Sequence, residues 1–574
     1  MATADKYDRQ LRLWGAKGQR ALGETTVVLL RATAAGTETL KNLVLPGIGH
    51  FHVVDDVQHI TKNMISSNFF LGPSSNSRAQ VACEYLQELN DDCRGTFQHV
   101  PSGLHQIRDW QTEVFAPLLK VSSNSTSKSI LVIASDLEPP LLEQVSQACH
   151  DSKLPLVAVQ SYGLVGIVRL QTPSPMAILD PKPTNAPPDL RLASNTFPAL
   201  ATLADSIDWD TLKDHEHGHV PYPLILIKVA KEYKATHGGA LPTTMAQKQD
   251  FKALIPKLSR GGMDKEVNFS EAHQNAYLAY TERTVDWVDD LDLVAAAGGG
   301  DIDNTKLGYL LAALRQFMAN HHQQPPVNGS IPDMTASTDM YVQLQTIYRD
   351  QAAKDLQEMK SYLNHHVVAT GNNHANASSD VVVVVSDDDL QSFCTNVYAI
   401  SRLQTRTLVE EYNDPPTEEL VDDWNMVTFD PYEVAEHTPL IWYLGFRGCQ
   451  LFYHTHHRYP GVPVEVINND NNDNDNWDWE TDIPVLHECI GKVVDQYQLT
   501  ENDMIQQVLL SDSQFKKVAH ELTRYAHAEI HTIASVVGGV ASQEAVKLIT
   551  GQYVPLDNTY VFNGIASVGG VYRF

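Results

Sequence analysis

The sequence predicts an α/β fold in which helices cover both faces of a parallel β-sheet. Short runs of β-branched and apolar residues, such as Thr26–Leu30 (TVVLL) and Ile130–Ala134 (ILVIA), are typical of buried strands. Longer segments with helical spacing, such as Ser77–Leu89, lie between these runs. Strands that alternate with helices form parallel sheets, because each helix returns the chain to the same end of the sheet.

Each element of this first domain follows from a local pattern. Helices repeat their apolar residues every three or four positions and end near Gly or Pro, whereas strands are short. In chain order the patterns predict a strand at Thr26–Leu30, a helix at Gly36–Val44, a strand at Phe51–Val54, a helix at Ser77–Leu89, a strand at Ile130–Ala134, a helix at Leu141–Cys149 and a strand at Leu156–Val159. We assign residues 1–165 to the first part of one domain.

Residues 166–510 are predicted to form a mainly helical domain inserted into the first one. Helical spacing recurs at Tyr222–Tyr233, Lys306–His321, Met340–Leu363 and Leu390–Tyr412. Stretches rich in small, polar or acidic residues predict disordered loops at about 295–301, 371–389 and 468–478. These loops are expected to be exposed insertions.

Residues 511–574 are predicted to complete the first domain. His531–Thr550 has the spacing of one long helix, and Gly551 is expected to end it. Its small residues recur every three or four positions, which allows close packing against another backbone: Ala534, Gly538, Ala541 and Ala545. Two short strands are expected near Tyr553–Pro555 and Tyr560–Phe562. One helix and two strands have no core of their own, so they are expected to return to the first domain.

Composition excludes several classes of protein. The 574 residues include 42 Lys and Arg against 70 Asp and Glu, a net charge of −28. This charge argues against binding to nucleic acid or anionic membranes, keeps the protein soluble and leaves room for a basic partner protein. No apolar run reaches the ~18 residues that span a bilayer. The six cysteines include no CxxC pair, so the sequence predicts neither disulfides nor a zinc site. We expect a protein of the cytoplasm, or also of the nucleus, that has no metal site.

The segment between the first strand and its helix lacks the glycines of a phosphate loop. Such a loop needs glycines for a tight turn and for close approach of backbone N–H groups to phosphate. Here it reads Arg31-Ala32-Thr33-Ala34-Ala35-Gly36, and only Gly36 stands at a glycine position, the one used for helix packing. Side chains at Arg31, Thr33 and Ala34 would stand where phosphate oxygens bind. The sequence predicts a nucleotide fold that has lost its nucleotide; the alternative is an unusual ligand held by Arg31.

Several motifs together resemble the adenylation fold of the activating enzymes for ubiquitin-like proteins. They are YDRQLRLWG from Tyr7, LKNLVLPGIGHFHVVDD over Leu40–Asp56, SYGLVGIVRL over Ser161–Leu170 and HTIASVVGGVASQEAVKLITGQY over His531–Tyr553. Within that family the chain is most similar to the regulatory, non-catalytic subunits of neddylation activating enzymes. The resemblance implies an inactive, Rossmann-like (ThiF-type) adenylation domain, interrupted by an insertion related to the catalytic-cysteine domain.

The resemblance also implies a heterodimer with divided roles. A catalytic partner subunit would hold ATP and magnesium, adenylate the C-terminus of a ubiquitin-like modifier, form a thioester and pass the modifier to a conjugating enzyme. This chain would bind no cofactor of its own. In the family, the arginine of the YDR motif reaches the partner's ATP phosphates, and that position is Arg9 here. The alternative for Arg9 is a salt bridge in the subunit interface.

Three further positions are compared with the functional residues of working members of the family. Working members of the family carry a nucleotide-binding arginine in the segment matched by Asn68-Phe69-Phe70, where this sequence has none. Asp136 matches a magnesium-binding aspartate, and we interpret it as a relic or a helix cap. Cys394 faintly resembles a catalytic Cys-Thr pair, but we expect a buried structural cysteine.

Candidate contacts with the partner or the modifier come from the middle of the chain. His215, His217 and His219 alternate, which predicts a strand with all three on one face. Such a face could bind metal, and an interface or modifier contact through His217 and His219 is favoured over metal; the family is similar in having a His-rich approach to a strand without metal. The resemblance places a subunit-binding stretch at Asp333–Thr346, which gives three further candidates: Asp333, Tyr341 and Leu344.

Other functions stay open on sequence grounds. A sumoylation-type activating subunit shares YDRQ but is much shorter. A self-sufficient adenylating enzyme or an NAD-dependent oxidoreductase would need a glycine loop, although Asp55 stands where a ribose-binding acid would be. A pure adaptor would take no part in adenylation. Pyrophosphate exchange by the purified pair would separate these functions.

Overall fold

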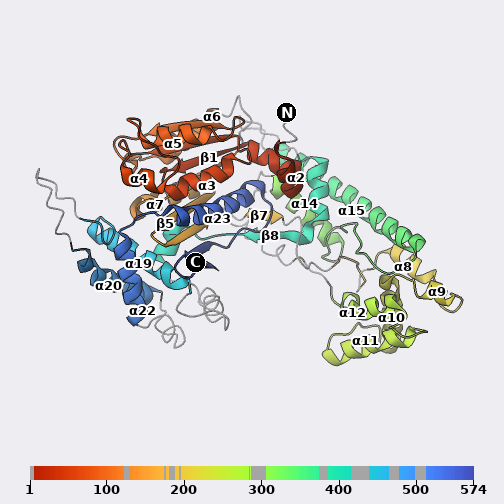
Figure 1. Ribbon diagram of the computed structural model, residues 1–574. Helices are drawn as coiled ribbons and strands as arrows, with labels where there is room; N and C mark the ends of the chain where they lie inside the picture. Colours follow the sequence, from red (N-terminus) through yellow and green to blue (C-terminus); the bar gives the residue numbers. More distant parts are fainter. Residues whose placement is uncertain are drawn as a thin grey trace, which may run out of the picture. The chain divides into compact units, whose positions relative to one another are not determined.

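The computed structural model describes residues 6–121, 129–173, 176–179, 188–192, 196–282, 285, 306–373, 385–414, 438–463, 478–497 and 512–574. The chain folds into two units (Figure 1). Unit 1 comprises Met1–Ile178 and Arg402–Phe574, and unit 2 comprises Leu179–Ser401. Among the described residues, no helix combines the length and apolar character that crossing a membrane requires.

Unit 1 is built on an eight-stranded sheet with the order β10-β9-β6-β5-β4-β1-β2-β3. Its strands are β1 Thr25–Leu30, β2 His50–Asp55, β3 Arg94–His99, β4 Ser129–Ser135, β5 Leu156–Tyr162, β6 Val165–Gln171, β9 Thr559–Asn563 and β10 Val568–Tyr572. β1 to β5 are parallel, as predicted for β1, β2, β4 and β5; β3 was not predicted. β6, β9 and β10 are antiparallel to their neighbours, so the sheet is mixed. The short turn between β5 and β6 requires this reversal, because a parallel connection needs a crossover.

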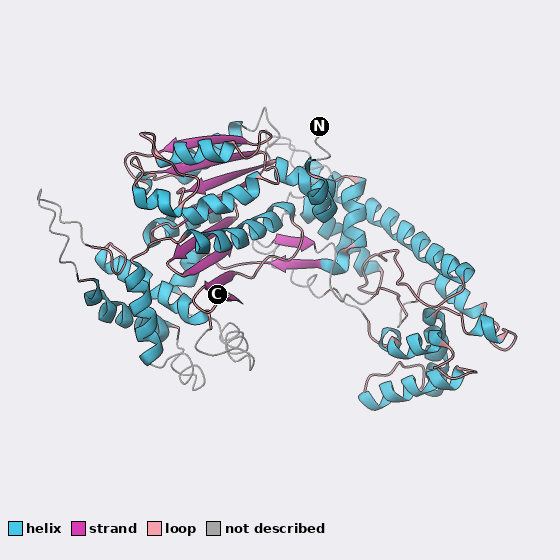
Figure 2. Cartoon of the chain, in the orientation of Figure 1, coloured by secondary structure: helices cyan, strands magenta, loops and turns pink. Residues whose placement is uncertain are grey.

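Helices cover this sheet (Figure 2). The helices of unit 1 are α2 Asp8–Gly23, α3 Ala34–Val44, α4 Lys62–Ser67, α5 Arg78–Gln87, η1 Leu104–Gln106, η2 Gln111–Phe115, α6 Ala116–Val121, α7 Pro139–Asp151, α17 Leu408–Asn413, α19 Leu440–His456, η8 Trp479–Thr481, α20 Asp482–Gln496, α22 Asp512–Tyr525 and α23 His531–Thr550. α3 begins earlier than predicted because the Thr33 hydroxyl accepts the N–H of Gly36 and caps the helix.

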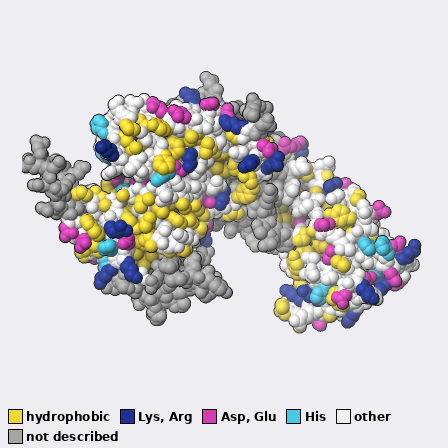
Figure 3. Space-filling model, in the orientation of Figure 1, with side chains coloured by type: hydrophobic (Ala, Val, Ile, Leu, Met, Phe, Trp, Pro, Cys, Tyr) yellow, Lys and Arg dark blue, Asp and Glu magenta, His cyan; other side chains and the backbone are white. Residues whose placement is uncertain are grey.

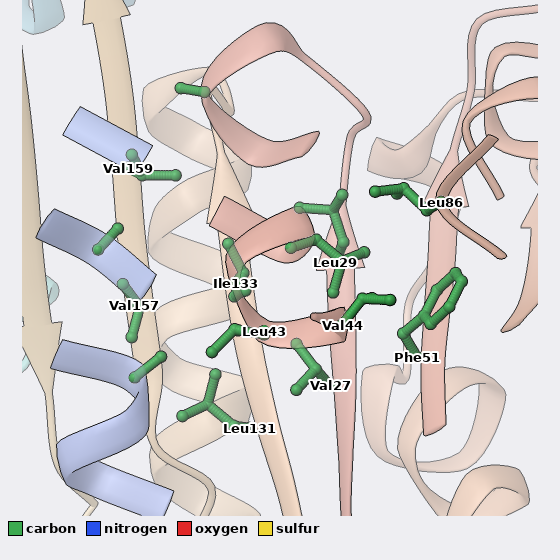
Figure 4. Packing of buried hydrophobic residues seen from close by; sticks show 14 of the residues in the cluster. Val27, Leu29, Leu43, Val44, Phe51, Leu86, Leu131, Ile133, Val157 and Val159 are labelled. Carbon is green, nitrogen blue, oxygen red and sulfur yellow. The ribbon is translucent and has the colours of Figure 1, made fainter. Parts of the chain in front are cut away.

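α3 and α23 pack together over one buried core (Figure 1). Figure 4 shows apolar side chains of β1, β4 and β5 meeting those of α3. A Cβ atom on Gly538 of α23 would lie 3.0 Å from the backbone oxygen of Ala35 and 3.0 Å from the nitrogen of Thr39. The small residues of α23 therefore allow the close helix contact that the sequence predicts. α23 spans the predicted residues, and Gly551 follows it with a φ of +61°.

The predicted insertion, 166–510, is larger than the separate unit, 179–401. β6 belongs to the large sheet, and α19, α20 and α22 form a second core of unit 1 with Tyr162, Val561 and Phe574. Helical periodicity shows that a segment has an apolar face but not which domain that face contacts. The boundaries at 166 and 510 are corrected accordingly.

Unit 2 is mainly helical. Its helices are α8 Pro198–Asp205, α9 Asp214–His217, α10 Tyr222–Thr236, α11 Met245–Leu258, α12 Val267–Gln274, η3 Ala276–Ala279, α14 Lys306–Asn320, α15 Thr338–Asn373, α16 Asp387–Thr395 and η5 Val397–Ala399. A two-stranded sheet of β7 (Met176–Leu179) and β8 (Ile400–Leu403) marks the places where the chain passes between the units.

Several predicted elements are wrong in detail. The helix expected at Leu390–Tyr412 is divided into α16, β8 and α17, because Thr407 and Glu410 form a new helix start. The loop expected at 371–389 overlaps α15 and α16, and Ser386 caps α16. The strand expected at Tyr553–Pro555 is absent from this described segment, since Tyr553 has a φ of +61°. The loop prediction at 295–301, all of that at 468–478 except Asp478, and residues 374–384 of that at 371–389 lie outside the described residues.

Candidate functional site

The loop between β1 and α3 uses its own N–H groups internally. The N–H of Ala32 donates to Asp55 Oδ2 at 2.7 Å, and that of Gly36 donates to Thr33 Oγ1 at 3.3 Å. The Cβ atom that Gly36 lacks would lie 2.7 Å from Ser135 of β4. Gly36 is therefore a packing glycine, as predicted, and the N–H groups that a phosphate loop leaves bare already have acceptors here.

A carboxylate from far along the chain occupies the first turn of α3. Glu529 accepts the N–H of Ala34 on Oε2 at 2.7 Å and that of Ala35 on Oε1 at 2.9 Å. Burial and the negative charge of Asp136 raise the pKa of Glu529 to about 7. Sequence reasoning missed Glu529 because nothing local connects it to residues some five hundred positions earlier.

Arg31 is neutralised within the chain. Its guanidinium lies 2.8 Å from Glu138 and 3.4 Å from Asp56, and its side chain is 16% exposed. Although burial opposes ionisation, these two carboxylates hold the pKa of Arg31 above its ordinary value. The alternative that Arg31 binds a ligand phosphate therefore requires that two ion pairs be broken.

Two acidic residues at the strand ends are also occupied. Asp55, the ribose-type position, is fully buried and accepts two nitrogens of Arg78 besides the N–H of Ala32 and Val57. Asp136 has a φ of +53°, and its Oδ1 lies 2.8 Å from Nε2 of His527. The helix-cap interpretation of Asp136 is wrong, because α7 begins at Pro139 and its N-cap residue is Glu138.

The segment that replaces the family's nucleotide-binding arginine supports the loop instead. Asn68 donates from Nδ2 to the oxygen of Ala32 at 3.2 Å and accepts the hydroxyl of Thr37 at 3.0 Å. Phe69 is 70% exposed, and its ring lies edge-on to that of His531.

A cleft of about 560 Å³ opens beside this loop. Arg31, Thr33 and Asp136 line it from the sheet edge, and Tyr459 and His527 line it from the segments after α19 and before α23. Ligands of open α/β sheets bind at this carboxyl end of the strands. The cleft remains, but its phosphate-binding end is taken by groups of the chain itself.

Arg9 is exposed on α2, and hydrogen bonds anchor the residue that precedes this helix. Tyr7, which precedes α2, is buried and donates its hydroxyl to Asp92 at 3.0 Å, while Asn90 donates to that hydroxyl at 3.1 Å. Asp8 and Arg12 pair with each other at 3.0 Å on the helix surface. Arg9 is exposed, and no hydrogen bond or ion pair holds its side chain in the described part of the chain.

The middle of α2 is held as well. The helix is kinked at Gly15, with a φ of +69°. The carbonyl oxygens that this kink frees accept bonds from beyond α23: Tyr553 donates to Leu13 at 3.0 Å, and Gln552 donates to Trp14 at 3.1 Å. α2 is therefore attached to unit 1 on both sides of Arg9.

Comparison with known proteins identifies the family of this chain. The chain matches the ThiF family over residues 7–568. It is 31% identical to the NEDD8-activating enzyme E1 regulatory subunit of Danio rerio, over 99% of this chain and 98% of that one, and 32% identical to that of Xenopus laevis with the same coverage. It is 32% identical to the regulatory subunit AXL of Arabidopsis thaliana, over 98% of this chain and 97% of that one. The chain belongs to the ThiF family, among the NEDD8-activating enzyme E1 regulatory subunits.

The family match identifies the fold of unit 1. The sheet and helices of unit 1 are a ThiF-type domain, and the match begins at Tyr7 and ends at Val568 in β10. Among solved structures, Escherichia coli MccB with AMPCPP and MccA is similar at 17% identity over 30% of this chain and 50% of that one, with a TM-score of 0.24.

Two of the candidate interface residues of this ThiF-family chain lie in the core of unit 2. His217 is 3% exposed, bonds Glu266 at 2.6 Å and stacks on Phe269; Leu344 is fully buried. The predicted strand of histidines is wrong, because Asp214–His217 forms a short helix. His217 and Leu344 are removed from the interface candidates.

The other candidates remain accessible. His219 is partly exposed, and its ring stacks on that of His215. The N–H of Ser337 donates to the oxygen of His219 at 3.1 Å, and the N–H of Tyr341 donates to Ser337 one turn later. The structure therefore brings His219 close to the start of α15, which carries Tyr341, while Asp333 is exposed just before it.

The cysteines of this regulatory-subunit homologue are buried and free of disulfides. Burial raises the pKa of Cys394 to about 12, so its thiolate is not available as a nucleophile at neutral pH. Among the described residues, no group of three or more His, Cys, Asp or Glu side chains is placed to hold a metal ion.

Proposed function

We propose that this chain is the regulatory subunit of a heterodimeric enzyme that activates a ubiquitin-like modifier of the NEDD8 type in the cytoplasm or nucleus. In this proposal it binds no nucleotide and lends Arg9 to the ATP site of a catalytic partner subunit. One observation carries the proposal: Arg9 is exposed and unpaired among the described residues of an anchored helix, while the loop that would bind phosphate is closed. The names of the relatives support the modifier and the partner.

The chemistry needs a fixed positive charge. In adenylation, the C-terminal carboxylate of the modifier attacks the α-phosphate of ATP, and pyrophosphate leaves with the electrons of the broken P–O bond. Negative charge grows on the transferred and departing phosphates, and a guanidinium placed beforehand stabilises it. Because Tyr7 and the carbonyls at Leu13 and Trp14 fix α2, Arg9 reaches the partner with little loss of entropy.

The surface around α2 and α23 supports a partner subunit. Exposed apolar side chains occur at Leu13 (55%), Phe69 (70%) and Val536 (44%). Figure 3 shows hydrophobic side chains gathered over α23 in unit 1. Exposed apolar patches on a globular protein are typical of protein–protein contacts. We assign this face to contact with the catalytic subunit. The surface formed by His219, Asp333 and Tyr341 is assigned to contact with the partner or with the modifier. A conjugating enzyme then receives the modifier.

Exchange of pyrophosphate into ATP by the assembled pair tests this function. The chain is co-purified with a NEDD8-type catalytic subunit, and exchange is measured with the modifier present. Arg9→Ala is expected to leave assembly intact and lower the exchange rate 10²- to 10³-fold, about 2.7–4 kcal/mol of transition-state stabilisation. Arg12→Ala is the matched control, because Arg12 lies on the same helix but pairs with Asp8. Undiminished exchange by an assembled Arg9→Ala pair would contradict the role of Arg9, and no exchange by the wild-type pair would favour an adaptor.

A further inference from the structure

The carboxylate of Glu529 lies at the N-terminus of α3, the kind of position at which nucleotide-binding folds hold phosphate. The first N–H groups of a helix have no partner within the helix, and the helix dipole adds partial positive charge there. In α3, which has eleven residues, two of these groups donate to the two oxygens of Glu529. The two bonds are 2.7 and 2.9 Å long, which is the range of charge-assisted hydrogen bonds.

Glu529 is held in this position from its own side as well. Its backbone forms an isolated bridge with Gly163, and the N–H of Gly163 donates to the oxygen of Ala528 at 2.7 Å. A Cβ atom on Gly163 would lie 2.1 Å from Tyr525, so the turn between β5 and β6 approaches this segment closely. The position of the carboxylate is therefore fixed by the sheet and not by a free side chain alone.

The surroundings of Glu529 disfavour its ionised form, and hydrogen bonds from α3 oppose that effect. No Lys or Arg forms an ion pair with Glu529 in the described residues; its bonds come from the N–H groups of α3. Burial and the nearby Asp136 raise the pKa of this carboxyl to about 7. A carboxylate in such surroundings persists only where hydrogen-bond donors compensate its loss of water.

We propose that Glu529 is a built-in occupant of the phosphate position, and that removing its carboxylate opens a phosphate-binding site at the start of α3. The chain then excludes nucleotide in two ways, by the missing glycines and by occupation. Thr33 and His527 both line the 560 Å³ cleft, so the vacated position is next to open space. The inference concerns unit 1 alone and stands whether or not Arg9 acts on a partner.

Pyrophosphate is the probe for this site, used with the full-length chain at pH 8. We expect 5 mM pyrophosphate to raise the Tm of Glu529→Ala by about 1–2 °C relative to the same ionic strength of NaCl, as ligand binding to the folded state does. The Tm of the wild type is expected not to respond. A titration by calorimetry is expected to give a Kd in the millimolar range for Glu529→Ala only.

Glu544→Ala is the matched control. Glu544 is 5% exposed, and its Oε2 accepts the N–H of Leu556 at 2.8 Å, so its loss also frees a partly buried backbone N–H group. This variant is expected to lose stability without responding to pyrophosphate, which separates a specific site from general stabilisation by the salt. A folded Glu529→Ala that responds no more than Glu544→Ala overturns the proposal.

Refolding keeps the test decisive if Glu529→Ala does not fold in buffer. The denatured variant is then diluted into pyrophosphate or into NaCl of equal ionic strength, and the recovered helical signal is measured. Recovery in pyrophosphate alone supports the proposal, because the probe then replaces the lost carboxylate. Failure in both solutions, or equal recovery in both, contradicts it.

Discussion

Arg78 and Asp55 form a two-point ion pair beneath the β1–α3 loop. Nε and Nη2 of Arg78 donate to the two oxygens of Asp55 at 2.8 and 3.1 Å, and the two side chains are 8% and 0% exposed. A buried pair of this kind ties α5, which begins at Arg78, to the end of β2. Because Asp55 also accepts the N–H of Ala32, the pair fixes the shape of the closed loop.

Removal of Arg78 is expected to destabilise unit 1 strongly. Arg78→Ala leaves the Asp55 carboxylate buried without its counter-charge, a change that costs about 3–5 kcal/mol of unfolding free energy. Urea unfolding followed by circular dichroism measures the loss. Arg12→Ala, which breaks an exposed pair on α2, is expected to cost at most about 0.5 kcal/mol. Similar losses for the two variants would show that the buried pair contributes no more than an exposed one.

Low pH is expected to destabilise unit 1 through the same ion pair. Although burial opposes ionisation, Arg78 holds the pKa of Asp55 below its ordinary value. The pair therefore makes its full contribution to the free energy of unfolding at pH values above the pKa of Asp55 in the unfolded chain, which is about 4. That contribution is lost as the pH falls below this value. We expect the unfolding free energy of the wild type to fall more steeply below pH 4 than that of Asp55→Asn. Parallel slopes for the two proteins would contradict this role of Asp55.

Substitution of two adjacent glycines of α23 by alanine is expected to change the free energy of unfolding in opposite directions. In Gly538→Ala the new Cβ meets the backbone of α3 at 3.0 Å, and the helices must separate. The expected loss is about 1–3 kcal/mol. In Gly539→Ala the Cβ meets no atom within 4 Å, and better helix propensity is expected to add about 0.5–1 kcal/mol. Thermal unfolding of the two single variants measures both, and a stabilising Gly538→Ala would refute the close contact.

The hydroxyl of Tyr7 is expected to affect pyrophosphate exchange because it anchors α2 and so positions Arg9. Tyr7→Phe removes the bonds to Asp92 and Asn90, so α2 starts less firmly. Because Asp92 is partly exposed, loss of these two hydrogen bonds is worth about 0.5–1.5 kcal/mol, and we expect pyrophosphate exchange by the pair to fall about 3- to 10-fold. In an Arg9→Ala background the same change is expected to have no further effect. Additive losses in the double variant would separate Tyr7 from Arg9.

The sequence predicted what local patterns determine. Strands β1, β2, β4 and β5, the length of α23 and the packing role of Gly36 all follow from composition and spacing within a few residues, whereas β3 was missed. The inward turn of His217 was missed, because Asp214 and Glu216 favour a helix start and override the alternation. Glu529 was missed for another reason: its partners are distant in sequence, and only the folded sheet places them together.

The order of the strands also has a consequence for synthesis of the protein. β6 ends at Gln171, and its neighbour β9 starts only at Thr559, after all of unit 2 has been made. During translation β6 therefore leaves the ribosome as an open sheet edge, which can pair with other nascent chains. Completion of this domain must wait for its last two strands, and we expect a chaperone to protect the waiting edge in the cell.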